Sequence, residues 1–148
     1  MVMTKGQLIK AVDETRVREA VERAERRTSG EIVVSVSGLF LGDVEKAAHR
    51  AFARLGVAQT RDRNGILIFV APARRRFMVL GDVGIHERVG QEFWNRIAAQ
   101  LSEHFRRSDF TEGLVRAIES IGEQLGTHFP YDAEGDINEL SNDVDFGV

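Results

Sequence analysis

Oxygen-bearing side chains stand at several predicted turns of this 148-residue sequence. Glu31 begins a valine-rich stretch, Asp62 and Asn64 precede a second apolar stretch, Asp82 follows a third, and Asp109 lies in the turn before the last predicted helix. Carboxylate and amide oxygens are the ligands that Ca²⁺ and Mg²⁺ prefer. We therefore predict a calcium or magnesium site at these five residues, provided that the fold brings them to one edge.

The same residues also have an ordinary structural interpretation. Glu31 would then be exposed at the start of a strand, Asp82 would lie in a plain turn, and Asp109 would cap a helix. Asp62 would pair with one of the two arginines that flank it. These arginines argue against a dense cation site, and both interpretations stay open at the level of sequence.

A histidine stands close to these groups. His86 lies in GDVGIHERVG, residues 81–90, which we expect to form a turn bordering the site. It could act as a general acid or base, or be a solvated turn histidine. The sequence has no HExxH, GxGxxG or P-loop motif, and the absence of cysteine excludes disulfides and thiolate chemistry. Whether the protein is an enzyme is therefore left open.

A second candidate region holds the loop SGLFLGD and the arginines that follow Pro72. Backbone N–H groups at the helix that begins near Asp43 could bind an anion together with Arg74 or Arg75. Asp43 would repel that anion. The alternative is that the arginines only keep a turn solvated.

Apolar periodicity predicts the elements that must position these groups. Helical spacing covers residues 13–27, and Asp43 and Gly56 are typical of the start and end of a second helix. EIVVSVSG, ILIFV and FMVL are typical of strands, the last two joined as a hairpin by APARRR. Two more helices are predicted over 89–105 and 114–125. The order α-β-α-β-β-α-α predicts an α/β fold, a three-layer α/β/α sandwich with a small mixed sheet.

This order also predicts which groups meet. A helical crossover favours a parallel arrangement of the first two strands, and the hairpin makes the third antiparallel. Glu31, the segment RDRNG and Asp82 are then expected at one rim of the sheet, with the hairpin arginines at the opposite rim.

Charge divides the chain into two parts. Residues 131–148 hold six acidic residues and no Lys or Arg, whereas residues 1–130 carry a small basic excess within a net charge of −3. We expect a single domain over 1–130 and an acidic tail over 131–148, either flexible or an arm that orders on a surface. One Tyr, one Trp and a single arginine cluster predict no nucleic-acid partner.

No apolar run approaches the length of a membrane span, and the N-terminal residues do not resemble a signal peptide. We therefore expect a cytoplasmic location and no direct insertion into a membrane.

Several of these pieces together resemble the TPM domain family over about residues 10–128. Those pieces are Ser29-Gly30-Glu31, Asn64-Gly65, Gly81-x-x-Gly84, Phe105-Arg106, Ser108-Asp109-Phe110 and Gly113. The resemblance implies a compact α/β/α domain that binds divalent cations, often within membrane protein complexes, with acid phosphatase activity in some members. Arg63 departs from this pattern, because many members have aspartate there.

These observations favour a divalent-cation-binding protein-interaction module that reaches membrane protein complexes through an unidentified protein partner. The alternative is a metal-assisted acid phosphatase acting on phosphomonoesters, with His86 or a carboxylic acid transferring the proton. In a third interpretation the chain is an adaptor whose tail folds onto a basic surface, such as residues 74–76.

Overall fold

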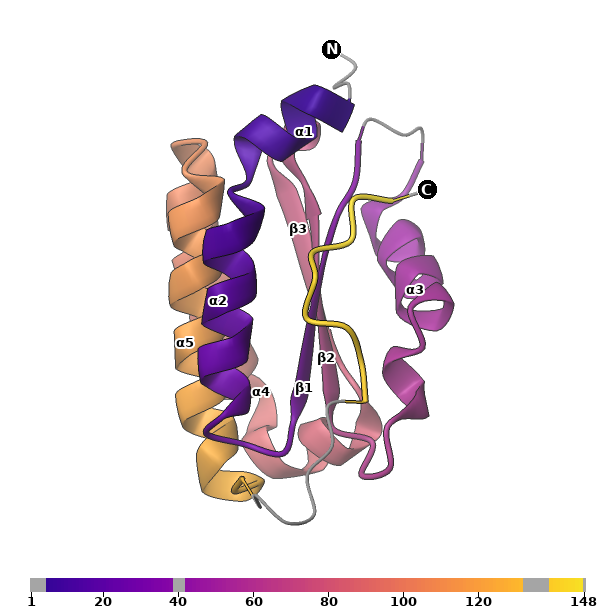
Figure 1. Ribbon diagram of the computed structural model, residues 1–148, viewed down its shortest axis with the longest axis vertical. Coiled ribbons are helices and arrows are strands. Elements are labelled where there is room, and N and C mark those ends of the chain that lie inside the picture. Colours follow the sequence, from indigo (N-terminus) through magenta and orange to yellow (C-terminus); the bar gives the residue numbers. More distant parts are fainter. Residues whose placement is uncertain (1–4, 39–41, 132–138, 148) are drawn as a thin grey trace.

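The protein is a three-layer sandwich in which a small sheet lies between helices (Figure 1). The computed structural model describes residues 5–38, 42–131 and 139–147. The predicted fold class and element order are confirmed, with one short helix added at the start. The elements are α1 (Lys5–Ala11), α2 (Glu14–Glu25), β1 (Glu31–Val36), α3 (Val44–Arg54), η1 (Val57–Gln59), β2 (Gly65–Ala71), η2 (Pro72–Arg74), β3 (Arg76–Gly81), α4 (Val83–Arg106) and α5 (Phe110–His128).

The sheet has the order β1-β2-β3 and mixed pairing, as predicted. β1 pairs parallel with β2, with Glu31 opposite Gly65, and β2 pairs antiparallel with β3, with Ile66 opposite Gly81. Side chains alternate between the faces of the central strand. Ile66 and Ile68 join the core under α2, α4 and α5, whereas Leu67 joins the core under α3. β2 is therefore buried on both faces, while β3 is an edge strand that is mostly half-buried.

Helices α2 and α3 begin at aspartates that cap them, whereas the side chain of Asp109 makes no such hydrogen bond at the start of α5. The side chain of Asp13 accepts a hydrogen bond from the backbone N–H of Arg16 at the start of α2, and Asp43 accepts one from Glu45 at the start of α3. On the face of the sheet opposite α3, α2 packs closely on α5. A Cβ at Gly122 would lie 2.7 Å from the Cβ of Ala24, so this approach requires glycine.

The segment GDVGIHERVG is not the turn that we predicted. Asp82 caps α4 by accepting a hydrogen bond from the Val83 N–H, and the helix begins at once. The side chain of Ile85 in its first turn is fully buried, which ties this turn to the core. Gly90, with φ 75° and ψ 169°, interrupts the helix near the start that we had predicted for it. The polar residues of this segment after Asp82 thus belong to the short section of α4 that precedes Gly90.

The described part of the acidic tail, residues 139–147, runs along β1 (Figure 1). Residues 132–138 lie outside the described residues, so the predicted flexibility of the whole tail stays a prediction. The arm nevertheless lies on β1 and beside Arg54, whereas we had suggested residues 74–76 as its basic surface. In the described part of the chain, no helix is both long and apolar enough to cross a membrane.

Candidate functional site

The predicted rim exists, and three of its five residues come together there. The backbone N–H of Glu31 donates to the carbonyl of Asn64 at 3.3 Å, and the N–H of Asp82 donates to the carbonyl of Gly65 at 2.9 Å. Asp62 is next to these residues but points to solvent, with 47% of its side chain exposed and Arg61 at 3.7 Å. Parallel pairing of β1 with β2, and the hairpin from β2 to β3, explain this convergence.

Asp82 is held by a guanidinium. Arg63 Nε lies 2.5 Å from Asp82 Oδ2, and Arg63 Nη2 lies 2.7 Å from Oδ1, which also accepts the Val83 N–H at 2.8 Å. The hydrogen bonds from Arg63 hold the pKa of Asp82 below its usual range. Both oxygens of the carboxylate are therefore already bound to a cation supplied by the chain itself.

Glu31 is buried and belongs to a pair of acids. Its side chain and that of Glu25 share a hydrogen bond, and desolvation by burial raises the pKa of Glu25 to about 9. Burial also raises the pKa of Glu31. Glu25 accepts the Ile32 N–H at 3.0 Å, and Glu31 Oε1 accepts the Glu139 N–H at 2.6 Å. A protonated Glu25 beside an ionised Glu31 explains this arrangement, because two like charges would repel.

The sequence prediction missed Glu25. Three other glutamates of its helix, Glu14, Glu19 and Glu22, have an arginine four residues later, whereas Glu25 has Ser29. A glutamate without a helical partner, followed by a buried strand, is the one signal that could have singled it out. Its burial depends on the way in which α2 meets β1, which local periodicity does not show.

The structure does not bring Asp109 to this rim. Asp109 precedes α5, whose C-terminal end contacts the start of β1 through the Phe129 carbonyl, which accepts the Ser29 N–H at 2.9 Å. The full length of α5 thus separates Asp109 from Glu31. Asp109 instead lies 3.2 Å from His104 Nδ1, at the opposite end of the sheet.

As arranged, the rim does not fit a divalent cation. Asp82 is bound to Arg63, Asp109 is at the other end, and Glu25 and Glu31 hold a proton between them. Among the residues that the structure describes, no three His, Cys, Asp or Glu side chains are grouped so that they could hold a metal ion. The side chain of Asn64 is buried, and its Nδ2 donates to Ser29 Oγ at 3.4 Å. Glu31, Asn64 and Asp82 therefore have a structural role at this rim, where their hydrogen bonds join the ends of β1, β2 and β3.

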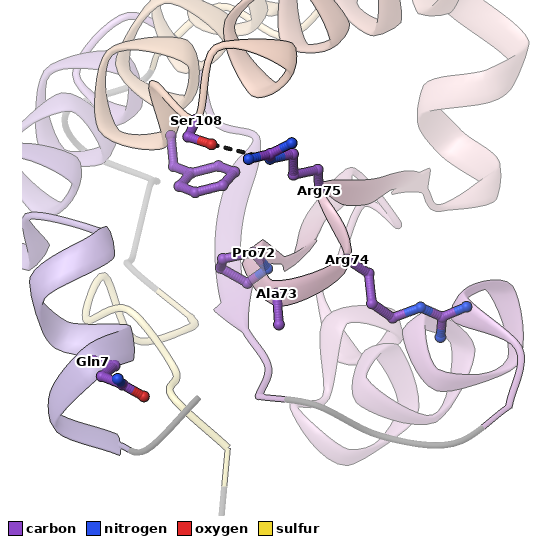
Figure 2. Close-up of a pocket in the computed structure, with 7 residues that line it drawn as sticks. Gln7, Pro72, Ala73, Arg74, Arg75 and Ser108 are labelled. Carbon is purple, nitrogen blue, oxygen red and sulfur yellow. Dashed lines mark hydrogen bonds between the residues drawn. The ribbon is translucent and has the colours of Figure 1, made fainter. Parts of the chain in front are cut away.

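A pocket of about 540 Å³ opens at the opposite rim, beside the hairpin (Figure 2). Pro72, Ala73 and Phe110 give it apolar walls, and Arg75 and Ser108 lie next to each other in its lining, with Arg75 Nε donating to Ser108 Oγ at 3.1 Å. Both of these residues have a positive φ, 49° and 57°, respectively. Two tight turns thus bring the guanidinium of Arg75 and the hydroxyl of Ser108 together in the lining of the pocket.

This region only partly matches the anion site suggested by the sequence. Arg74 turns toward α3, where its Nη1 donates to the carbonyl of Gly42 at 2.8 Å, while Arg75 stays at the pocket. Residues 39–41 of SGLFLGD lie outside the described residues. Ser108 and Phe110 had not been predicted to line this region, because they come from the turn between α4 and α5, far away in sequence.

The fold agrees with the comparisons to known proteins. The chain matches the TPM domain over residues 2–124 and belongs to this family. It is similar to the BA42 protein from the psychrophilic bacterium Bizionia argentinensis, with 34% identity, 94% of each chain covered and a TM-score of 0.85. Among curated proteins, none matches the chain.

Two more distant structures share the fold. The N-terminal domain of a P. gingivalis protein is 18% identical, with a TM-score of 0.63 over 89% of this chain and 98% of that one. The N-terminal domain of the cg2496 protein from Corynebacterium glutamicum is 14% identical, with a TM-score of 0.59 over 88% and 75%, respectively.

Proposed function

We propose that this TPM domain is a non-catalytic interaction module that binds an acidic, partly apolar segment of a partner protein. The observation that carries the proposal is the pocket beside the hairpin, whose lining combines Arg75 with the apolar residues Pro72, Ala73 and Phe110 (Figure 2). Its ligand must combine an anionic group with an apolar side chain. A peptide segment with alternating acidic and apolar residues has this chemistry.

The charge of Arg75 supports an acidic ligand. Its partner in the pocket is the neutral hydroxyl of Ser108, and among the described residues no carboxylate lies within 4.0 Å of its guanidinium as an ion pair. A guanidinium binds carboxylates through charge-assisted hydrogen bonds, which are about twice as strong as neutral ones. Arg63, by contrast, is already paired with Asp82 and offers no such site.

The partner that we propose belongs to a membrane protein complex, and the domain binds it in the cytoplasm. The family resemblance supports the first part of this statement. The second part is a prediction from the sequence that no other observation supports.

Calcium or magnesium binding at Glu31, Asp62, Asn64 and Asp82 is part of the proposal only in a conditional form. A cation can reach Asp82 only after Arg63 has left it, so in the wild-type chain the guanidinium takes the place of the ion. Arg63→Asn tests this, because asparagine tolerates the φ of 51° at this position and removes the guanidinium. We expect calorimetric heat of calcium or magnesium binding in Arg63→Asn and none in the wild type. Equal heats in both proteins would refute the claim that the guanidinium of Arg63 takes the place of a cation at Asp82.

Binding of an acidic segment is tested with two synthetic peptides, ELDFE and the uncharged analogue QLNFQ. We expect ELDFE to bind the wild-type protein, and Arg75→Gln to weaken it about ten-fold, which is the effect of losing one charge-assisted hydrogen bond. Arg61→Gln is the matched control, because Arg61 has 70% of its side chain exposed and lies at the other rim. Equal affinity of both peptides, or no effect of Arg75→Gln, would refute the proposal.

Metal-assisted hydrolysis of phosphomonoesters has no comparable observation in its favour. The ring of His86 packs against Trp94, with 5.4 Å between centroids, and Asp82 is engaged by Arg63. The purified wild-type protein is therefore expected not to hydrolyse a generic phosphate ester. Turnover that is lost in Asp82→Asn would support the phosphatase instead.

A further inference from the structure

The edge of β1 that faces away from β2 is covered by the chain's own C-terminal arm, residues 139–147 (Figure 1). The carbonyl of Val34 accepts the Asp145 N–H at 2.9 Å, and the Val36 N–H donates to the Asp145 carbonyl at 2.7 Å. Ser35 and Asp145 form a parallel bridge. The arm is thus placed as a short additional strand on the free side of the sheet.

One aspartate of the arm is bound by side chains of the groove. Asp145 Oδ2 accepts a hydrogen bond from Ser35 Oγ at 2.7 Å and lies 2.7 Å from Arg54 Nη2. Burial acts to raise the pKa of Asp145, but the hydrogen bonds from Arg54 and Ser35 outweigh it and lower the pKa. The carboxylate is therefore recognised as an anion.

An apolar contact lies beside this charged one. Val144 is 8% exposed and packs with the core under α2, α4 and α5, which Phe146 also touches. Leu140 packs instead with the core under α3. The edge thus offers places for apolar side chains on both sides of the strand, next to the site for the carboxylate.

The arm pairs with only a short part of this edge, although it is also held at its start, where Glu31 Oε1 accepts the Glu139 N–H at 2.6 Å and Glu139 Oε2 accepts the Arg61 N–H at 3.1 Å. Val144 is its single buried residue among residues 139–147, and one bridge joins it to β1. Residues of β1 with even numbers direct their main-chain groups to the free edge, and the arm bonds to the Val34 carbonyl and the Val36 N–H. A longer strand would add hydrogen bonds along this edge, so a partner segment could make more contacts than the arm makes.

We propose that the edge of β1 is a peptide-binding groove that takes an extended segment of a partner protein parallel to β1, with an aliphatic residue followed by aspartate. The partner's aspartate binds Arg54 and Ser35, and its aliphatic side chain takes the place of Val144. The chain's own arm occupies the groove until such a segment displaces it. Edge pairing of this kind gives affinity through main-chain hydrogen bonds and specificity through side-chain pockets. This groove is separate from the pocket at Arg75, and Arg75→Gln leaves its residues unchanged, so a peptide bound in the groove keeps its affinity in that variant and each proposal can fail without the other.

A tethered arm competes strongly, because its effective concentration is in the millimolar range. A peptide added in trans will therefore bind better when the arm alone is weakened and the groove is left intact. The probe is a fluorescein-labelled peptide with the arm's own sequence, ELSNDVDFG, and binding is followed by fluorescence anisotropy on the full chain.

Asp145→Asn removes the charge that Arg54 recognises and leaves every groove residue unchanged. We expect the peptide to bind Asp145→Asn about ten-fold or more tighter than the wild type. Asp143→Asn is the matched control, because it makes the same charge change in the same arm. The side chain of Asp143 is 73% exposed, and its ion pair with Arg18 is long, at 3.8 Å. This control variant is expected to behave as the wild type. Adding Arg54→Gln to Asp145→Asn should remove the gain.

Equal peptide affinity for the wild type and Asp145→Asn would overturn the proposal, as would no binding to a folded Asp145→Asn protein. A concentration-dependent dimer of Asp145→Asn in sedimentation would also overturn it, because the groove would then take the arm of a second copy.

Hydrogen exchange on the wild type tests the same inference without any variant. We expect the amide of Val36 to exchange at least ten-fold faster than the amides of β2, since arm release is a local opening. Equal exchange rates would mean that the arm leaves only on global unfolding, and would overturn the proposal.

Discussion

Replacing Glu25 by glutamine should remove a pH dependence from the stability of this protein. In the folded chain burial raises the pKa of Glu25 from 4.5 to about 9. The folded state then holds a proton that the unfolded state releases, so the stabilisation is complete below pH 4.5 and is lost as the pH rises toward 9. Glutamine mimics the protonated acid, because it accepts the Ile32 N–H through its oxygen and donates to Glu31 through its amide.

The size of the effect follows from the two pKa values. A shift of one unit corresponds to 1.36 kcal/mol, so the whole window from 4.5 to about 9 sets an upper limit of about 6 kcal/mol. The three pH units between pH 5.5 and pH 8.5 limit the loss to about 4 kcal/mol, and because the titration of Glu25 is coupled to that of Glu31 we expect roughly 3 kcal/mol. Glu25→Gln should be more stable than the wild type at pH 8.5 by a similar amount.

Urea unfolding at pH 5.5 and pH 8.5 measures this difference directly. Glu19→Gln is the control, because Glu19 is an exposed glutamate on the same helix, and its free energy of unfolding should follow that of the wild type. If Glu25→Gln and the wild type lose the same stability between the two pH values, the buried acid pair does not hold a proton, and our account of Glu31 is refuted.

Two further substitutions test the fold that positions both rims. Gly122→Val should lower the free energy of unfolding by about 2 kcal/mol or more, because a Cβ there would meet the Cβ of Ala24 at 2.7 Å, and thermal unfolding would detect it. Asp43→Ala should cost about 1 kcal/mol in urea unfolding through loss of the cap on the Glu45 N–H at 2.8 Å; no change would show that α3 does not need this cap.

Much of the fold could be predicted from the sequence because local patterns carry it. Valine-rich stretches, helical periodicity and the caps at Asp13 and Asp43 are local features, and the order of elements follows from them. The meeting of Glu31, Asn64 and Asp82 was predictable for the same reason, since a parallel pair followed by a hairpin brings their strand ends to one rim.

The remainder of the site depends on distances and rotamers that sequence patterns do not contain. Asp109 was expected at the acidic rim, but α4 has 16 residues after Gly90 and carries the chain roughly 24 Å toward the other end before α5 begins. The ion pair between Arg63 and Asp82 depends on a positive φ at Arg63, which is uncommon for arginine. The pocket at Arg75 joins α1, η2 and the turn before α5, three segments that are distant in sequence.

The measurement that tests the central claim most directly is a two-dimensional NMR titration of the full chain with the peptide ELDFE. We predict that the largest amide shifts occur at Ala73, Arg75, Ser108 and Phe110, and that the uncharged QLNFQ does not reproduce them. Shifts that cluster at Glu31 and Asp82, or no saturable shifts at all, would contradict the assignment of partner binding to the pocket beside the hairpin.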